Sequence, residues 1–382
     1  MNTPNAVFAT RPRTIGEKFS RLNWGLITLL CALAVIGVIM HFSVSAGSWA
    51  EMPLTHGVRF AVMLALVIVA ALIDIRVWIA IAYPLYAIGF LLLVAVELFG
   101  ETRMGATRWL DLGFTSLQPS EVMKIAIILA LARYYHQLEP RRTGSLLWMM
   151  PPLAMLLLPV ALVMHQPDLG TAMLILFTGL AVMFLAGLRW RYIVPALIAA
   201  VVGAFLAYRF VLHEYQRDRI ETFLNPSADP LGTGYHVLQS KIAIGSAGLF
   251  GRGYLQGSQS QLDFLPEKHT DFIFTMIVEE FGLVGGFVVL FLYGLLMALA
   301  IAVALRARAL FGRLAAAGVA STLACYVFIN TAMVIGLVPV VGIPLPLISF
   351  GGTAMMTLMA GFAIVLSVDL HRDHTGSRGI LW

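Results

Sequence analysis

The sequence has little charge and few cysteines. Only 12% of its 382 residues are Asp, Glu, Lys or Arg, whereas 60% are hydrophobic. This composition is too apolar for a soluble globular chain, and it also excludes disordered and fibrous proteins. The two cysteines, Cys31 and Cys325, lie within apolar runs, which favours packing over disulfide formation. The chain is therefore predicted to be an all-α, polytopic membrane protein.

Long apolar runs are abundant in this sequence. A hydrocarbon core of roughly 30 Å requires about 20 mostly apolar residues in each transmembrane helix. We predict ten transmembrane helices in a single membrane domain, over approximately residues 23–42, 57–74, 77–99, 120–135, 147–164, 169–187, 190–212, 272–305, 312–338 and 346–368. The eighth is long and is interrupted by Gly282, Gly285 and Gly286.

The basic residues predict the orientation of these helices. Ten spans place fifteen of the 25 Lys and Arg residues on one side, which the positive-inside rule assigns to the cytoplasm. They are Arg11, Arg13, Lys18, Arg21, Arg76, Arg133, Arg141, Arg142, Arg189, Arg191, Arg306, Arg308, Arg313, Arg372 and Arg378. Both termini, residues 1–22 and 369–382, are then cytoplasmic, and the first span is expected to stay as an uncleaved anchor. The net charge of +5 reflects this topology, so no nucleic-acid partner is expected.

Residues 213–270 form a large extracytoplasmic loop between the seventh and eighth spans. Its 58 residues exceed an ordinary connection, and its apolar content argues against disorder. The run 237–250 predicts a short helix at the membrane interface. The loop also carries Arg217, Arg219 and Lys241, which could bind an anionic ligand or simply extend toward lipid headgroups.

Charged residues gather at the outer end of the fourth span. Arg108 precedes this span, and Glu121 and Lys124 follow Pro119 at its start. Ser120 is predicted to cap the helix. Glu121 and Lys124 are three residues apart, so they share a helix face and can form an ion pair. The pair could be purely structural, or it could also line a polar substrate cavity.

Two acidic residues stand at the outer ends of later spans. Asp168 precedes the sixth span and could simply cap that helix. Asp271 separates the polar loop from the apolar run 272–274, where the helix dipole would favour a carboxylate. A partly desolvated carboxylate at this depth could instead act as a general base toward a hydroxyl. The motif contains no second carboxylate of the kind that ordinary glycosidases pair.

Four segments carry a resemblance to a known family. They are Asp229-Pro230-Leu231-Gly232 with Gly234-Tyr235-His236, the stretch 239–246, the run 264–274, and Gly342-Ile343-Pro344-Leu345-Pro346-Leu347 with Ser349-Phe350-Gly351-Gly352. In this order they resemble the SEDS family (shape, elongation, division and sporulation), from the first span to the tenth. Residues 259–268 look more like the elongation, rod-shape branch than the division branch. Ala247 stands where glycine is common in the family.

The resemblance implies a peptidoglycan glycosyltransferase of the bacterial cytoplasmic (inner) membrane. Its implied substrate is lipid II, the undecaprenyl-pyrophosphate-linked disaccharide pentapeptide, polymerised on the outer face of the membrane. The implied partners are a class B penicillin-binding protein, a PBP2-like transpeptidase, and other membrane proteins of the elongation complex. The family's essential aspartate matches Asp271, and its cavity residues match Arg108, Glu121, Lys124 and Asp168.

The family reaction turns an α-linked donor into a β-1,4 bond with inversion. This chemistry needs a base for the acceptor 4-hydroxyl and cations for the departing pyrophosphate. Asp271 suits the base, and the candidate cations are Arg108, Lys124, Arg217, Arg219 and Lys241. A divalent cation, Mg²⁺ or Mn²⁺, could share this task, although no motif contains the several carboxylates of a metal cage.

Three alternatives remain at the level of sequence. The protein could be a lipid II flippase, the division-type synthase of the same family, or a scaffold that only recruits cell-wall enzymes. The acidic and basic residues gather on one side, whereas a flippase needs a path that opens to both sides. This distribution favours the enzyme. A scaffold would leave Asp271 dispensable.

Overall fold

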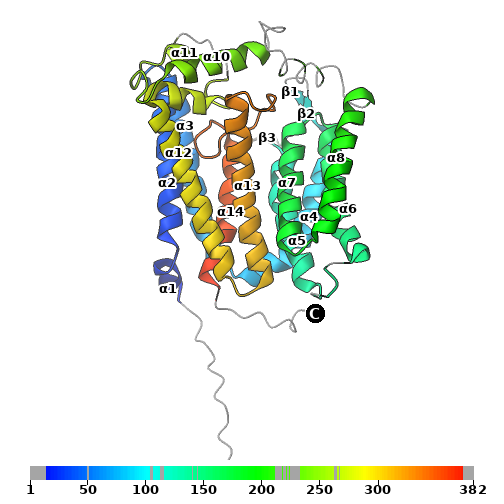
Figure 1. Cartoon of the computed structure of the whole chain (residues 1–382). Coiled ribbons are helices and arrows are strands. Elements are labelled where there is room, and N and C mark those ends of the chain that lie inside the picture. Colours follow the sequence, from blue (N-terminus) through cyan, green and yellow to red (C-terminus); the bar gives the residue numbers. More distant parts are fainter. Residues whose placement is uncertain are drawn as a thin grey trace, which may run out of the picture.

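The computed structural model describes residues 14–49, 51–103, 106–111, 116–139, 141–143, 145–210, 217, 221, 223, 233–261, 265 and 267–372. It is a bundle of long helices with a small sheet at one end (Figure 1). The elements are α1 (Ile15–Ser20), α2 (Trp24–Val44), α3 (Glu51–Ala71), α4 (Ile75–Phe99), β1 (Glu101–Arg103), β2 (Ala106–Asp111), β3 (Ser116–Leu117), α5 (Pro119–Gln137), α6 (Leu146–His165), α7 (Leu169–Leu185), α8 (Trp190–Phe210), α10 (Thr233–Ser246), α11 (Ser258–Gln261), α12 (Ile273–Arg306), α13 (Leu310–Val334) and α14 (Gly352–Leu370).

Most of these helices have the dimensions of membrane spans. Within the described residues, seven are long and apolar enough to cross a bilayer, namely α2, α3, α4, α6, α12, α13 and α14. The apolar helix α7 is shorter, and α5 and α8 coincide with the predicted fourth and seventh runs. The predicted class, a mostly helical polytopic membrane protein, is therefore confirmed.

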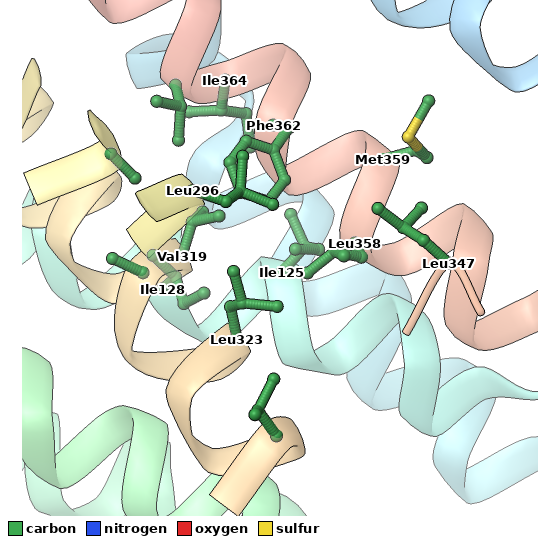
Figure 2. Packing of buried hydrophobic residues seen from close by; sticks show 14 of the residues in the cluster. Ile125, Ile128, Leu296, Val319, Leu323, Leu347, Leu358, Met359, Phe362 and Ile364 are labelled. Atoms are coloured by element: carbon green, nitrogen blue, oxygen red, sulfur yellow. The ribbon is translucent and has the colours of Figure 1, made fainter. Parts of the chain in front are cut away.

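The centre of the bundle is formed by α5, α13 and α14. Figure 2 shows Ile125 and Ile128 of α5, Val319 and Leu323 of α13, and Leu358 and Phe362 of α14 packed together. Gly318 lets α13 approach α5 closely, because a Cβ at this position would lie 2.7 Å from Cγ2 of Ile128. In contrast, α3 leaves many apolar side chains outside the protein core, as expected for a helix that faces lipid.

The connection between α4 and α5 contains an antiparallel sheet in the order β1-β2-β3. The all-α prediction missed it. Leu110 pairs with Leu117 and Asp111 with Ser116, so the short connection satisfies its backbone groups through hairpin pairing. In Figure 1 this sheet lies at the same end of the bundle as α10 and α11, and α1 lies at the opposite end.

Helix α12 bends sharply at Gly282, one of the three glycines that interrupt the predicted span. Gly282 has φ +70° and ψ −168°, a conformation available almost only to glycine. The segment 248–253 fills the bend and replaces the missing helical hydrogen bonds. Its contacts are Leu283 N to Gly248 O and Val284 N to Leu249 O, both at 3.1 Å, and Arg252 N to Glu279 O and Gly253 N to Glu280 O, both at 3.0 Å.

Helix α10 lies across the start of α12 and the end of α13. It covers 233–246 instead of the predicted 237–250, because Gly248 has a positive φ of +64° that ends the helical path. The buried Ser240 hydroxyl lies 2.7 Å from Thr275 Oγ1 and donates to the Val334 carbonyl at 2.8 Å. Ser240 thus fixes α10 to the start of α12 and the end of α13.

Two predicted span starts are wrong by more than a turn. Helix α3 begins at Glu51, whereas the prediction begins at 57. Helix α14 begins at Gly352, whereas the prediction begins at 346. The residues before Gly352 stay non-helical because Leu347 has a positive φ of +69° and Gly351 is extended, with φ −160° and ψ 96°. This non-helical segment, 342–351, borders the candidate site.

Candidate active site

A cavity of about 280 Å³ lies at the N-terminal ends of α5, α7 and α12. The segment 342–351 and the start of α14 also line it. The side chains that carry its chemistry are Arg108, Glu121, Lys124, Asp168, Asp271 and Tyr326. Five of these six are residues that the sequence singles out. The fold brings them together from β2, α5, α13 and the residues just before α7 and α12.

Glu121 and Lys124 form a buried ion pair, as their spacing predicts. Lys124 Nζ lies 2.8 Å from Glu121 Oε1, and the two side chains are 1% and 6% exposed. Thr357 Oγ1 donates to Glu121 Oε2 at 2.6 Å, and the Lys124 ammonium also contacts the Tyr326 hydroxyl. These extra hydrogen bonds offset the cost of removing both charges from water.

The predicted capping role of Ser120 is wrong. Helix α5 begins at Pro119, so Ser120 lies within the helix and Gln118 takes the N-cap position without a side-chain capping bond. Proline is well suited to the first turn because it lacks the N–H that a cap would satisfy. The Gln118 side chain points elsewhere and donates to Asp168 Oδ2 at 3.3 Å.

Asp168 combines the predicted capping role with a place in the cavity. Its Oδ1 accepts from Thr171 N at 3.2 Å, which confirms that it caps α7. Its Oδ2 lies 3.9 Å from Arg108 Nε. Arg108 also donates to the Pro167 carbonyl, yet its side chain remains 31% exposed. The guanidinium is therefore oriented by protein acceptors while part of it still faces the cavity.

Asp271 is held by its backbone immediately before α12. Three successive backbone carbonyls accept hydrogen bonds here. His269 O accepts from Phe350 N at 2.8 Å, and Thr270 O accepts from Ser349 Oγ at 2.6 Å. Asp271 O accepts from Asn330 Nδ2 at 2.9 Å. The carboxylate lies beside Gly342, where a Cβ would come within 3.5 Å of Asp271 Oδ2. The half-buried Asp271 thus has a fixed main chain and a side chain at the cavity wall.

The cavity combines two cationic groups with three carboxylates. The Glu121 carboxylate is engaged by Lys124 and Thr357, and Asp168 by the start of α7 and by Arg108. Asp271 belongs to a different wall, formed with the segment 342–351. Such a site can bind an anionic group near the cations and present a carboxylate to a hydroxyl. Within the described residues, no group of three or more His, Cys, Asp or Glu could hold a metal ion.

The other predicted cations lie elsewhere. Arg217 donates to the Arg209 carbonyl at 3.1 Å, and exposed Lys241 lies on α10 with its side chain against Gly336. Neither lines the cavity. Arg219 is outside the described residues.

The sequence interpretation missed three buried polar residues that support the site, Tyr326, Asn330 and Thr357. The available signal was their polarity within apolar spans, where an unpartnered hydroxyl or amide is costly. Their partners lie far away in the chain, so sequence alone could not show what they contact.

Comparison with known proteins gives consistent matches over nearly the whole chain. The family described as "Cell cycle protein", FtsW/RodA/SpoVE, matches residues 23–374. The peptidoglycan glycosyltransferase MrdB of Escherichia coli (strain K12) is 46% identical over 351 residues, which cover 91% of this chain and 93% of the relative.

Two solved structures are also similar. One, described as "Structural coordination of polymerization and crosslinking by a peptidoglycan synthase complex", matches with a TM-score of 0.80 and 32% identity, covering 92% of this chain and 99% of the matched chain. The rod shape determining protein RodA of Thermus thermophilus matches with a TM-score of 0.69 and 30% identity, covering 92% and 98%.

Proposed function

The chain belongs to the FtsW/RodA/SpoVE family, also called SEDS, and from this membership we propose that its cavity polymerises lipid II into glycan strands. The protein is a peptidoglycan glycosyltransferase of the type that serves cell shape. The observation that carries the proposal is one cavity in which Asp271 lies on one wall and Arg108 and Lys124 on others.

Each wall has a role in the proposed reaction. Asp271 takes the proton from the 4-hydroxyl of the acceptor sugar as the hydroxyl oxygen attacks C1 of the donor sugar. The C1–O bond to the diphosphate breaks, and undecaprenyl diphosphate leaves with the bonding electrons. Arg108 and Lys124 stabilise the negative charge that develops on the leaving group. Attack from the face opposite the leaving group gives the inverted, β-linked product.

Glu121 and Asp168 orient the two cations in this proposal. Glu121 holds Lys124 at 2.8 Å, and Asp168 lies 3.9 Å from Arg108. The cations therefore reach the diphosphate with little rearrangement. We assign Arg217, Arg219 and Lys241 to the outer loop, where they would attract the anionic headgroup before it enters the cavity.

The proposed topology has ten spans, with both termini in the cytoplasm and the cavity on the extracytoplasmic side. The basic residues support it, and so does the coincidence of a helix with each predicted span. The cavity lies where α5, α7 and α12 begin, at the level where a lipid-linked diphosphate would sit. The membrane would be the bacterial inner membrane.

The proposed partner is a class B penicillin-binding protein, which would crosslink the strands. The similarity to a chain from a peptidoglycan synthase complex that coordinates polymerisation and crosslinking supports such a pairing. Other membrane proteins of the elongation complex are proposed to join them.

A divalent cation, Mg²⁺ or Mn²⁺, fits this site as a companion of the substrate. Mg²⁺ often binds through one or two carboxylates together with substrate phosphates. Asp271 is the cavity carboxylate that could supply this contact, since Glu121 is engaged by Lys124 and Thr357, and Asp168 by the start of α7 and by Arg108. When bound, the ion would add positive charge at the diphosphate.

Purified protein with its partner and lipid II tests the proposed function. We expect glycan strands that persist when the transpeptidase is inhibited, and a loss of rate on chelation if an ion accompanies the diphosphate. Recovery of intact lipid II would contradict the enzyme. Translocation of fluorescent lipid II in the same vesicles, without polymer, would instead identify a flippase.

A further inference from the structure

Helix α13 carries three buried polar side chains on one face. Thr322, Tyr326 and Asn330 follow one another at four-residue intervals, and they are 2%, 1% and 0% exposed. Residues spaced by four lie above one another on a helix, so the three form a polar row among apolar neighbours. Each member of this row contacts a different part of the protein, and two of the contacts lead to the cavity.

Tyr326 contacts Lys124. Its hydroxyl is hydrogen-bonded to the ammonium, which also lies 4.8 Å from the centre of the Tyr326 ring. Glu121 contacts the same ammonium at 2.8 Å. The cation is therefore fixed by two groups, one from its own helix α5 and one from α13.

Asn330 connects the two segments that form the Asp271 wall. Its Nδ2 donates to the Asp271 carbonyl at 2.9 Å and to the Ile343 carbonyl at 2.7 Å. Ile343 follows Gly342, the residue beside which the Asp271 carboxylate lies. A single amide thus sets the position of the carboxylate's main chain relative to the neighbouring cavity wall.

We propose that Tyr326 and Asn330 are positioning residues for glycosyl transfer, Tyr326 acting through Lys124 and Asn330 through Asp271. The proposal rests on the proposed function, which assigns the diphosphate to Lys124 and the base to Asp271. The two residues are one turn apart on a single helix, so their backbone positions differ by about 6 Å along its axis. Helix α13 thereby sets the spacing between the group that holds the donor and the group that activates the acceptor.

Thr322 provides a matched control on the same row. Its hydroxyl lies 3.1 Å from Thr178 Oγ1 and donates to the Gly318 carbonyl at 2.9 Å, and it does not line the cavity. Thr322→Val removes a buried hydroxyl from the same helix face. It should alter the melting temperature while leaving kcat and KM for lipid II unchanged.

The two positioning residues should give different kinetic signatures. Tyr326→Phe keeps the ring but removes the hydroxyl. We expect KM for lipid II to rise about 10-fold and kcat to fall as well, because Lys124 binds the diphosphate before the reaction and stabilises the charge that develops on it. Asn330→Leu removes both donors to the Asp271 wall, and we expect kcat to fall about 100-fold with lipid II binding retained. Steady-state polymerisation, lipid II binding and thermal melting in the same detergent give these values.

Asn330→Asp provides a second variant of similar volume, should the leucine variant fold poorly. Its carboxyl can donate only when protonated, so we expect its kcat to recover partly as the pH falls. Asn330→Leu should show no such recovery, and a purely structural role would give neither pattern.

The outcomes separate this proposal from the proposed function. If Asp271→Asn is inactive but Asn330→Leu and Asn330→Asp turn over like the wild type, the positioning role is wrong and the base survives. If Tyr326→Phe leaves KM unchanged, the role of Tyr326 is wrong. If Asp271→Asn polymerises normally, Asp271 is not the base, and if the wild-type protein leaves lipid II intact, the proposed function itself fails.

Discussion

At the scale of single residues, the buried pair of Glu121 and Lys124 joins stability to chemistry. Both side chains are almost completely buried, and the pair lines the cavity. Removing one partner of such a pair leaves an uncompensated charge, which costs far more than an exposed ion pair contributes. The pair therefore has a structural role whatever its role toward a substrate.

Glu121→Gln should lower the free energy of unfolding by about 3–5 kcal/mol, because Lys124 loses its counter-charge. The double variant Glu121→Gln with Lys124→Met should recover most of this stability without recovering polymerisation. Thermal melting in detergent and glycan synthesis measure the two effects separately.

A matched control for this prediction is Glu139→Gln. Glu139 pairs with Arg142 at 3.0 Å and at the same three-residue spacing, but both side chains are exposed. We expect its free energy of unfolding to change by less than about 1 kcal/mol.

Full activity of the double variant Glu121→Gln with Lys124→Met would contradict a role for Lys124 toward the substrate.

The sequence predicts some of these residue contacts and not others. The spacing of Glu121 and Lys124 predicts their pairing, and the position of Asp168 predicts its capping of α7, because both depend on local helix geometry. The contacts of Tyr326 and Asn330 depend on helix packing between distant segments. No local pattern encodes that packing.

At the scale of elements, the bend of α12 depends on Gly282. A Cβ there would lie 2.3 Å from the Leu249 carbonyl oxygen and would need a backbone conformation that other residues avoid. The bend also binds the segment that connects α10 to α11. Integrity of the segment between α10 and α11 is therefore coupled to one glycine inside helix α12.

Gly282→Ala should lower the free energy of unfolding by about 1–3 kcal/mol, which is the usual cost of such a backbone conformation for a residue with a side chain. Gly294→Ala, in the same helix, meets no atom within 4 Å and should be neutral or stabilising by about 0.5–1 kcal/mol. Melting temperatures and protease sensitivity of the outer loop compare the two variants. Equal stability of both would show that the bend is not required.

Apolar run length predicts the helices well, but it predicts their ends and connections less well. The glycines of the eighth run indicate its interruption, and Gly282 is where the bend lies. The sheet β1-β2-β3 was missed because β1 and β3 are only three and two residues long, and the six residues of β2 do not alternate apolar with polar. The start of α14 was placed too early because 346–351 is mostly apolar, although Leu347 has a positive φ of +69° and Gly351 is extended.

At the scale of the whole molecule, the account requires the two ends of the bundle to face different compartments. Gln256 lies at the end with α10 and α11, and Arg141 lies in the connection between α5 and α6. Both are exposed. In intact cells stripped of their outer envelope, a membrane-impermeant maleimide should label Gln256→Cys but not Arg141→Cys.

Permeabilised cells should show labelling of both cysteines, and the wild-type chain gives the background from Cys31 and Cys325. The reverse pattern would place the cavity on the cytoplasmic side and would contradict the proposed reaction there.

The central claim is that Asp271 acts as the base in a cavity that polymerises lipid II. Its most direct measurement is the rate of glycan synthesis by purified Asp271→Asn with its partner, alongside lipid II binding by the same sample. The account predicts a loss of at least about 100-fold in rate with the fold and lipid II binding retained. Polymerisation at the wild-type rate would contradict it.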